Sequence, residues 1–186
     1  MTISGKKVAI LATNGFEQAE LEVPRDRLAQ AGAIVEIVSP EKAEICGWET
    51  KDWGHTVPVD RNLDDANADD YDALVLPGGQ INPDLLRVNA KALDFIRAFG
   101  KQNKTIAAVC HAPWLLIETG LAKGRKVTAY KSIKTDMINA GAKWQDSEVV
   151  VDGRIITSRN PGDLEAFSTK IIEALNQRSS GARSAA

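Results

Sequence analysis

The chain has 186 residues, of which 44% are hydrophobic and 26% charged, and its formal net charge is −2. This length favours one domain with a full buried core, and the charge gives no electrostatic reason to expect nucleic acid or an anionic membrane as a partner. No apolar stretch approaches the ~20 residues that cross a bilayer. The two cysteines, Cys46 and Cys110, show no disulfide framework, which predicts a cytoplasmic protein.

Short apolar runs typical of buried strands alternate with helical patterns along the chain. In chain order the pattern predicts a strand at 7–12, a helix over 21–31, a strand at 34–38, a strand at 73–76, a helix over 89–99, a strand at 105–109, a helix over 112–119 and a last helix from 160 to 175. Continuous apolar strands that alternate with helices are typical of a parallel sheet covered on both faces. We therefore expect an α/β sandwich, with its site at the carboxyl ends of the strands.

Three segments depart from this alternation. Residues 43–60 contain two tryptophans and several glycine or proline breaks, which indicates an edge hairpin outside the main sheet. Residues 149–157 contain Asp152-Gly153 between two apolar runs, the signal of a second hairpin. The small polar residues at the end predict a disordered tail over 178–186, which leaves a single domain over 1–177.

The most informative residue is Cys110, at the abrupt change from strand to helix. A side chain on such a turn stands clear of the sheet, beside the unpaired amides at the start of a helix. These amides stabilise a thiolate, so we expect a lowered pKa and a nucleophilic role for Cys110. His111 follows directly, and it can donate its backbone N–H to an oxyanion or move a proton with its side chain.

The position of the histidines excludes two common enzyme classes. Glutamine amidotransferases and α/β-hydrolases place their catalytic histidine well after the nucleophile, and no histidine follows His111 here. With two histidines and two cysteines in the whole chain, a zinc site would consume nearly all of them, so we expect no metal.

The other two loops at this edge, 13–17 and 77–84, offer further groups. Gly78 and Gly79 permit close approach of the backbone, and the amide of Gly79 is a candidate oxyanion donor. Burial of Glu17 would favour its protonated form, which could hydrogen-bond the cysteine sulfur. By contrast, Glu20 and Glu22 are interpreted as solvated helix charges. Asp84 is equally consistent with a helix-start acid and with a catalytic one.

Several segments together resemble the DJ-one/PfpI superfamily, and in particular its PfpI-type branch of general stress proteins. The matching segments, which span about 6–175, are Asn14-Gly-Phe-Glu17, Ala73-Leu-Val-Leu-Pro-Gly-Gly79, Ala108-Val-Cys-His-Ala-Pro113, Asp136-Met-Ile-Asn-Ala-Gly141 and Thr157-Ser-Arg-Asn-Pro161.

This resemblance implies a three-layer, flavodoxin-like sandwich and a homodimer or higher homo-oligomer that needs no cofactor. It implies that Cys110 is the nucleophile, Glu17 its carboxylic acid, and Gly79 and His111 the oxyanion donors. It also implies that Asp84 from a neighbouring subunit orients His111, although some relatives have Glu at this position. Tyr130 matches a tyrosine that lines the family's site.

The activities assigned to the family leave three hypotheses. The first is an enzyme that acts on reactive dicarbonyls, or on their adducts with proteins, through a thiohemiacetal on Cys110. The second is an intracellular cysteine peptidase whose Cys-His-acid site is completed at a subunit interface. The third is a redox-sensing stress protein or chaperone without turnover, in which oxidation of the Cys110 thiol is the functional event.

Overall fold

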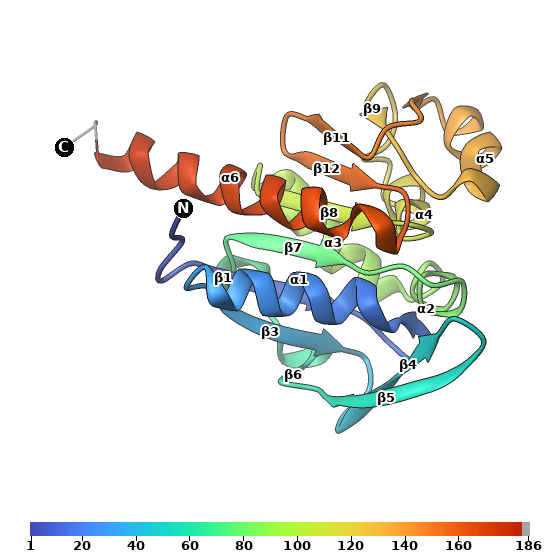
Figure 1. The fold of residues 1–186 in the computed structure, drawn as a ribbon, viewed down its shortest axis with the longest axis horizontal. Helices are drawn as coiled ribbons and strands as arrows, with labels where there is room; N and C mark the ends of the chain where they lie inside the picture. Colours follow the sequence, from blue (N-terminus) through green and yellow to red (C-terminus); the bar gives the residue numbers. More distant parts are fainter. Residues whose placement is uncertain (184–186) are drawn as a thin grey trace.

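A seven-stranded sheet forms the centre of the computed structural model, which describes the backbone of residues 1–183 and the side chains of residues 1–177 (Figure 1). The strand order is β11-β12-β8-β7-β1-β3-β6, and all neighbours are parallel except β11 and β12. The strands are β1 (Lys7–Leu11), β3 (Ile34–Ser39), β6 (Arg61–Asn62), β7 (Ala73–Leu76), β8 (Thr105–Val109), β11 (Val149–Asp152) and β12 (Ile155–Ser158). The expected parallel sheet and the hairpin at 149–157 are thus confirmed.

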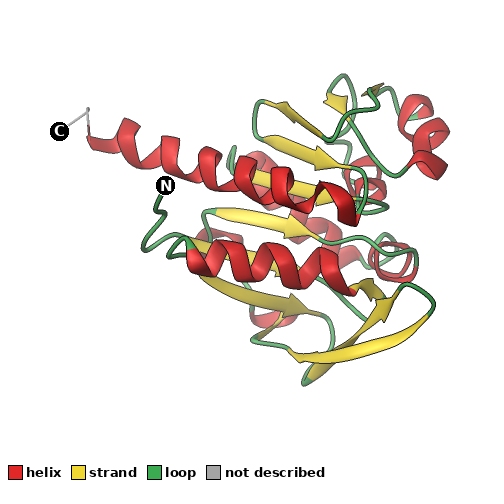
Figure 2. Cartoon of the chain, viewed as in Figure 1, coloured by secondary structure: helices red, strands yellow, loops and turns green. Residues whose placement is uncertain are grey.

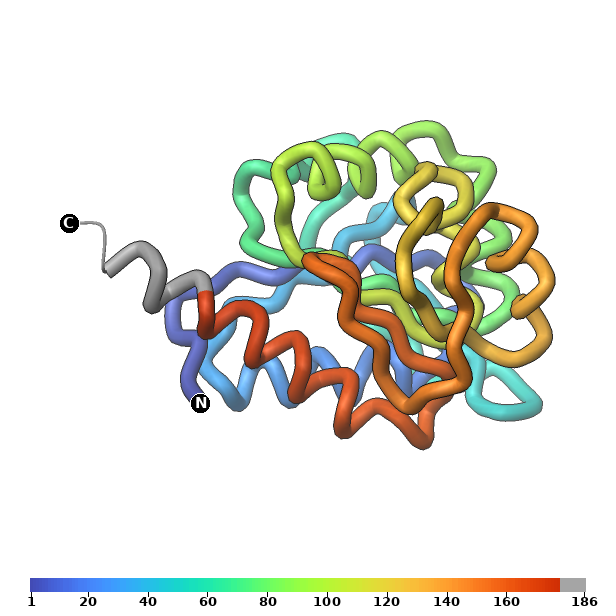
Figure 3. The backbone as a smooth tube through the Cα atoms, turned by 90° about the horizontal axis from the view of Figure 1, so that it is seen from above, coloured from blue at the N-terminus to red at the C-terminus, as the bar shows by residue number. Residues whose placement is uncertain are grey.

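Helices cover both faces of this sheet (Figure 2). Helices α1 (Gln18–Gln30) and α6 (Leu164–Arg183) pack together on one face, and α3 (Ala90–Lys101) and α4 (Pro113–Glu118) lie on the other. The view from above in Figure 3 separates the three layers. The expected α/β sandwich with helices on both faces is confirmed.

Side chains along β1 alternate between two hydrophobic cores, one on each face of the sheet. Val8 and Ile10 pack with the residues of α1 and α6, whereas Ala9 and Leu11 pack with those of α3 and α4. All four side chains are fully buried. A strand buried on both faces is apolar at every position, which explains the uninterrupted runs in the sequence.

Smaller elements surround the carboxyl edge of the sheet. Residues 43–60 form the antiparallel hairpin of β4 (Glu44–Glu49) and β5 (Asp52–Pro58), which joins β2 (Phe16–Glu17) in a separate three-stranded sheet. This confirms the expected excursion. The remaining elements are α2 (Ile81–Leu86), α5 (Lys134–Asn139), the strands β9 (Lys126–Val127) and β10 (Lys143–Trp144), and the 3-10 turns at Leu63–Asp65, Ala68–Asp70, Lys131–Ile133 and Pro161–Asp163.

The order of the strands places a crevice at the carboxyl edge. From β1 the chain passes to β3 on one side, and it later returns to β7 on the other side of β1. The loops that follow β1 and β7 therefore diverge, and ligands of open α/β sheets bind at such a point. Strand β8, which ends at the predicted nucleophile, lies beside β7.

Three further expectations concern the C-terminal tail, membrane-spanning helices and metal-binding groups. Of the predicted tail over 178–186, residues 178–183 fall within α6 and residues 184–186 lie outside the described part. Within the described residues, no helix is long and apolar enough to cross a membrane. The same residues contain no group of three or more histidine, cysteine, aspartate or glutamate side chains that could hold a metal ion.

Candidate active site

A cavity of about 610 Å³ opens at the carboxyl edge of the sheet. The three loops singled out in the sequence all contribute to it, and the hairpin of β4 and β5 adds Trp48 and Thr50. The polar or catalytic candidates among its lining residues are Glu17, Glu20, Gly79, Cys110, His111 and Tyr130.

Cys110 occupies a tight turn between β8 and α4. Its φ of +63° lies in the left-handed region, which costs a residue other than glycine about 1–2 kcal/mol. Two backbone hydrogen bonds hold the turn: the Cys110 N–H donates to the carbonyl of Ser158 (3.1 Å), and its carbonyl accepts from the N–H of Tyr130 (2.8 Å). The residue is 6% exposed, so the thiol is nearly buried at the floor of the cavity.

The carboxyl beside the thiol belongs to Glu20, whose interpretation as a solvated helix charge is wrong. Glu20 is fully buried in the first turn of α1, and its Oε2 accepts a hydrogen bond from the Gly78 N–H at 2.8 Å. The carboxyl also interacts with the Cys110 thiol, while its buried Oε1 has no hydrogen-bond partner among the described residues. Burial raises the pKa of Glu20 to about 8, so this carboxyl is protonated at neutral pH.

Gly78 makes this contact possible because it has no side chain. A Cβ at this position would lie 2.6 Å from Glu20 Oε2 and 2.7 Å from Cys110 Cβ. The glycine therefore fits between the carboxyl and the nucleophile, and its amide satisfies one oxygen of the buried acid. The sequence marked Gly78 only as a place of close backbone approach.

Glu17 lies in the same cavity but is only half-buried. Burial raises the pKa of its carboxyl, opposed by a hydrogen bond from the Thr50 backbone. In the described structure the carboxyl that interacts with the Cys110 thiol is that of Glu20, three residues after Glu17, and the role of Glu17 stays a prediction. Glu17 instead presents a carboxyl to the open part of the cavity.

The thiol of Cys110 differs from the sequence-based expectation. Burial raises its pKa, and so does negative charge on Glu20, whereas hydrogen bonds from the backbone amides of Gly79 and His111 lower it. The net direction is upward, opposite to the lowering that the sequence suggested. The physical reason is that α4 has only six residues, and the field at its start is outweighed by the loss of water around the sulfur.

His111 links the thiol to a residue that sequence reasoning missed. Its Nδ1 lies 3.1 Å from Cys110 Sγ, and its Nε2 lies 3.1 Å from the hydroxyl of Ser132. The ring stacks on Tyr130, with centroids 4.9 Å apart, and meets the edge of Trp114 at 5.2 Å. Burial lowers the pKa of His111, so the imidazole is neutral at physiological pH. Ser132 has no sequence signal of its own, since it stands in an exposed turn.

Gly79 stays the candidate oxyanion donor. Its backbone amide lowers the pKa of the Cys110 thiol, as does that of His111. Its φ is +78°, and a Cβ there would lie 2.5 Å from the carbonyl oxygen of Gly15 and 2.7 Å from the amide nitrogen of Glu17. Asp84, in contrast, is exposed on α2 and is not part of the cavity lining within this chain.

Comparison with known proteins matches this geometry to one family. The DJ-1/PfpI family model matches residues 6–174. Deglycase PfpI from Pyrococcus furiosus is 45% identical over 169 residues, which cover 91% of this chain and 99% of that relative. General stress protein 18 from Bacillus subtilis is 39% identical over 174 residues, covering 93% of this chain and 99% of that relative.

One solved structure has the same fold, and its sequence identity to this chain equals that of general stress protein 18. It is a two-domain protein from Anabaena variabilis with DJ-1/ThiJ/PfpI-like and ferritin-like domains, with a TM-score of 0.86 and 39% identity. The match covers 92% of this chain and 48% of that one, so this chain spans about half of the two-domain protein. The chain belongs to the DJ-1/PfpI family.

Proposed function

We propose that this protein is a cysteine-dependent enzyme that converts reactive dicarbonyls, or their adducts with proteins, to hydroxy acids. The observation that carries this is the placement of the Cys110 thiol against a neutral imidazole and a protonated carboxyl in one small cavity. The similarity to a protein named as a deglycase supports the proposal. The free thiols of Cys46 and Cys110 suit a reducing compartment, so we infer that the enzyme acts in the cytoplasm.

The first step forms a bond between sulfur and carbon. The Cys110 sulfur adds to the aldehyde carbon of methylglyoxal while the thiol proton passes to Nδ1 of His111, 3.1 Å away. The carbonyl π bond breaks, and its oxygen takes the negative charge among the amides of Gly79 and His111. The imidazolium then returns the proton to this oxygen, which gives a neutral hemithioacetal. With an amine adduct, the Cys110 sulfur bonds to the same carbon and the carbon–nitrogen bond breaks. The amine then leaves with the proton that came from the thiol.

The second step is an internal redox exchange that needs no external oxidant. A base removes the proton from the carbon bonded to sulfur, and a proton is delivered to the neighbouring ketone carbon. The hydroxyl proton of the hemithioacetal passes to the ketone oxygen. The first carbon is thereby oxidised to a thioester and the second is reduced to an alcohol. Glu17 is the half-buried carboxyl of the cavity, and its raised pKa suits a group that both takes and gives a proton. Water then cleaves the thioester to lactate and the free thiol.

Glu20 acts on the sulfur and does not touch the substrate carbon. While protonated it can donate a hydrogen bond to the sulfur as the thiol loses its proton, which stabilises the developing thiolate. Once ionised it opposes that charge. We therefore expect turnover to fall as the pH rises through about 8, the pKa of this carboxyl. A pH profile of kcat from 6 to 9.5 measures this, and a constant kcat across that range would contradict it.

The proposal is tested by lactate release from methylglyoxal and from methylglyoxal-modified acetylarginine. We expect Cys110→Ser to lose at least about 10³-fold in kcat/KM, because the weaker nucleophile cannot form the sulfur adduct. The matched control is Cys46→Ser, in β4, whose thiol contacts the carbonyls of Gly47 and Gly54 outside the cavity. Equal turnover in both variants would reject the proposed function.

Peptide hydrolysis is the second candidate, and it depends on a neighbouring subunit. Within the described chain His111 is bonded to Ser132 at Nε2, so an acid for this histidine must come from elsewhere. Asp84 lies on α2 beside the exposed side chains of Ile81 and Leu85, which favour contact with a second copy. We infer a homo-oligomer on this basis. Analytical ultracentrifugation measures it, together with a peptidase assay of Asp84→Ala. Absence of peptide cleavage by the wild type would refute this candidate, and a monomer that cleaves peptides would refute its dependence on a second subunit.

A further inference from the structure

A second cavity of about 510 Å³ lies next to the active-site cavity. The two share Tyr130 and Pro161 as lining residues, and the ring of Tyr130 stacks on His111. The second cavity is also lined by Lys131, Trp144, Arg159 and Asn160. None of these four lines the active-site cavity.

The size of the active-site cavity already favours a substrate larger than a free dicarbonyl. At about 30 Å³ for each water-sized group, a molecule of five heavy atoms such as methylglyoxal displaces about 150 Å³. The cavity holds about 610 Å³, so most of it stays unfilled. A modified arginine or lysine side chain has the length to fill it, and the chain that carries this side chain then has to lie in adjoining space.

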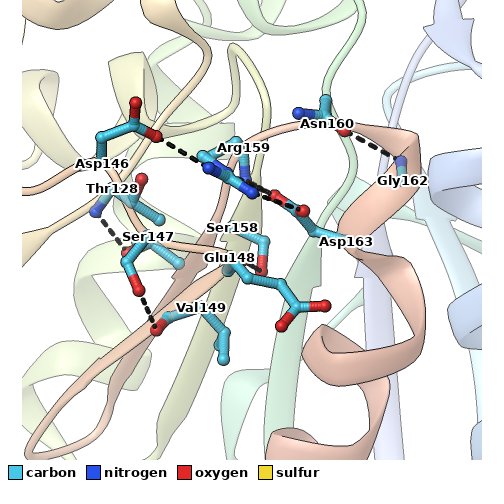
Figure 4. Close-up of polar contacts among 11 residues, drawn as sticks. Thr128, Asp146, Ser147, Glu148, Val149, Ser158, Arg159, Asn160, Gly162 and Asp163 are labelled. Atoms are coloured by element: carbon cyan, nitrogen blue, oxygen red, sulfur yellow. Dashed lines mark hydrogen bonds and ion pairs between the residues drawn. The ribbon is translucent and has the colours of Figure 1, made fainter.

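The second cavity is lined by several hydrogen-bond donors, and polar contacts hold two of them, Arg159 and Asn160 (Figure 4). Arg159 is held by Asp163, to which Nε and Nη2 donate at 2.9 and 3.0 Å, and by Asp146, to which Nη1 donates at 2.8 Å. These bonds use three of the five N–H groups of the guanidinium and leave two. Asn160 accepts from the Gly162 N–H through Oδ1, which leaves its NH₂ group as a donor.

The charges favour neutral acceptors over phosphates. Arg159 is paired with two aspartates, and Lys131 is the one cation of this lining without an ion pair among the described residues. A nucleic acid backbone needs several unpaired cations. Peptide carbonyls need only N–H donors, and the rings of Tyr130 and Trp144 supply apolar walls for the side chains between them.

We propose that the second cavity binds the main-chain carbonyls of a peptide whose glycated side chain occupies the active-site cavity. This assignment rests on the proposed function, and it makes a peptide-borne adduct the preferred substrate class over free methylglyoxal.

The test measures binding separately from turnover. A labelled pentapeptide with one methylglyoxal-modified arginine is bound to the Cys110→Ser protein, and fluorescence polarisation is compared with that of labelled, modified acetylarginine amide. We expect the pentapeptide to bind about tenfold more tightly, as one or two added hydrogen bonds provide. Asn160→Asp keeps the acceptor for Gly162 and removes the donor, and Lys131→Met removes the charge. Each should abolish most of this tenfold preference.

The matched control is Asn67→Asp, since Asn67 also caps a 3-10 turn through Oδ1, away from both cavities. It should keep the full preference. Equal binding of the two ligands, or an unchanged preference in Asn160→Asp and Lys131→Met, overturns the assignment. Tighter binding of a modified oligonucleotide that depends on Lys131 overturns it in favour of nucleic acid. Peptide preference without any lactate release from the wild type supports the cavity and rejects the proposed function.

Discussion

At the scale of single residues, the chemistry depends on two buried groups that are neutral at the same pH. Glu20 keeps its proton because its burial is nearly complete, and His111 stays unprotonated because it too is buried. Cys110 between them is a thiol until a substrate accepts charge. The nucleophile is therefore activated by proton transfer within the site and does not exist beforehand as a stable anion.

The raised pKa of Glu20 has a consequence for stability. The folded state holds this proton up to about pH 8, whereas the unfolded state releases it near 4.5. Between these values the native state binds more protons, so its stability falls as the pH rises and levels off above about 8. We expect Glu20→Gln to remove this dependence and to raise the free energy of unfolding at pH 8 by on the order of 2–4 kcal/mol, with little gain at pH 4.5.

Urea unfolding at both pH values measures the difference. Glu20→Ala separates the charge from the hydrogen bond, because it removes the acceptor for the Gly78 N–H and should destabilise by about 1–3 kcal/mol at both pH values. A Gln variant whose gain is the same at pH 4.5 and pH 8 would show that Glu20 does not titrate near 8.

Ser132 allows a second prediction at this scale. Its hydroxyl at 3.1 Å from Nε2 can accept the Nε2 proton, which leaves Nδ1 free to take the thiol proton. We expect Ser132→Ala to lower kcat by about tenfold, as loss of one orienting hydrogen bond does, while Ser132→Thr restores it. Nitrogen chemical shifts of His111 report the tautomer, and an unchanged tautomer in Ser132→Ala would contradict this role. Ser147→Ala, whose hydroxyl bonds the Val149 carbonyl, is the control.

At the scale of elements, the site depends on loops that approach each other through glycine. Gly79→Ala would bring a methyl group to 2.5 Å from a backbone oxygen and 2.7 Å from a backbone nitrogen at a φ of +78°. Backbone atoms cannot move aside cheaply, so we expect a loss of about 3 kcal/mol or more and a large fall in turnover. Gly124→Ala has a similar φ of +76° with open space around it, and it should cost only about 1 kcal/mol. Thermal unfolding of both variants measures this, and equal costs would refute the steric argument.

The elements also show what sequence patterns can and cannot predict. The strands at 7–12, 73–76 and 105–109 were predictable because burial on both faces leaves continuous apolar runs. The choice between Glu17 and Glu20 was not, since it depends on whether the residue before α1 or the first turn of α1 faces the cysteine in the turn after β8. Apolar periodicity assigns a charged residue to the solvent unless a partner is known, and the partner of Glu20 is an amide after β7.

At the scale of the whole molecule, two cores on opposite faces of one sheet stabilise the fold. Among the residues of α6 whose side chains the structure describes, the last one that enters the core is Leu175. We therefore expect removal of residues 178–186 to leave the melting temperature and lactate release unchanged, as a single domain over 1–177 requires. Differential scanning calorimetry of the shortened chain measures this. A lower melting temperature would show that the domain extends beyond residue 177.

The two ends of the domain lie at the opposite edge of the sheet from the active-site cavity, because of the direction in which the strands run. Strand β1 begins near the N-terminus at the amino edge of the sheet, and α6 runs back toward that same edge after β12, whereas the cavity opens at the carboxyl edge (Figure 1). A polypeptide joined at either end would leave the entrance clear. The fold can therefore be fused to another polypeptide at either end while its active site stays unchanged.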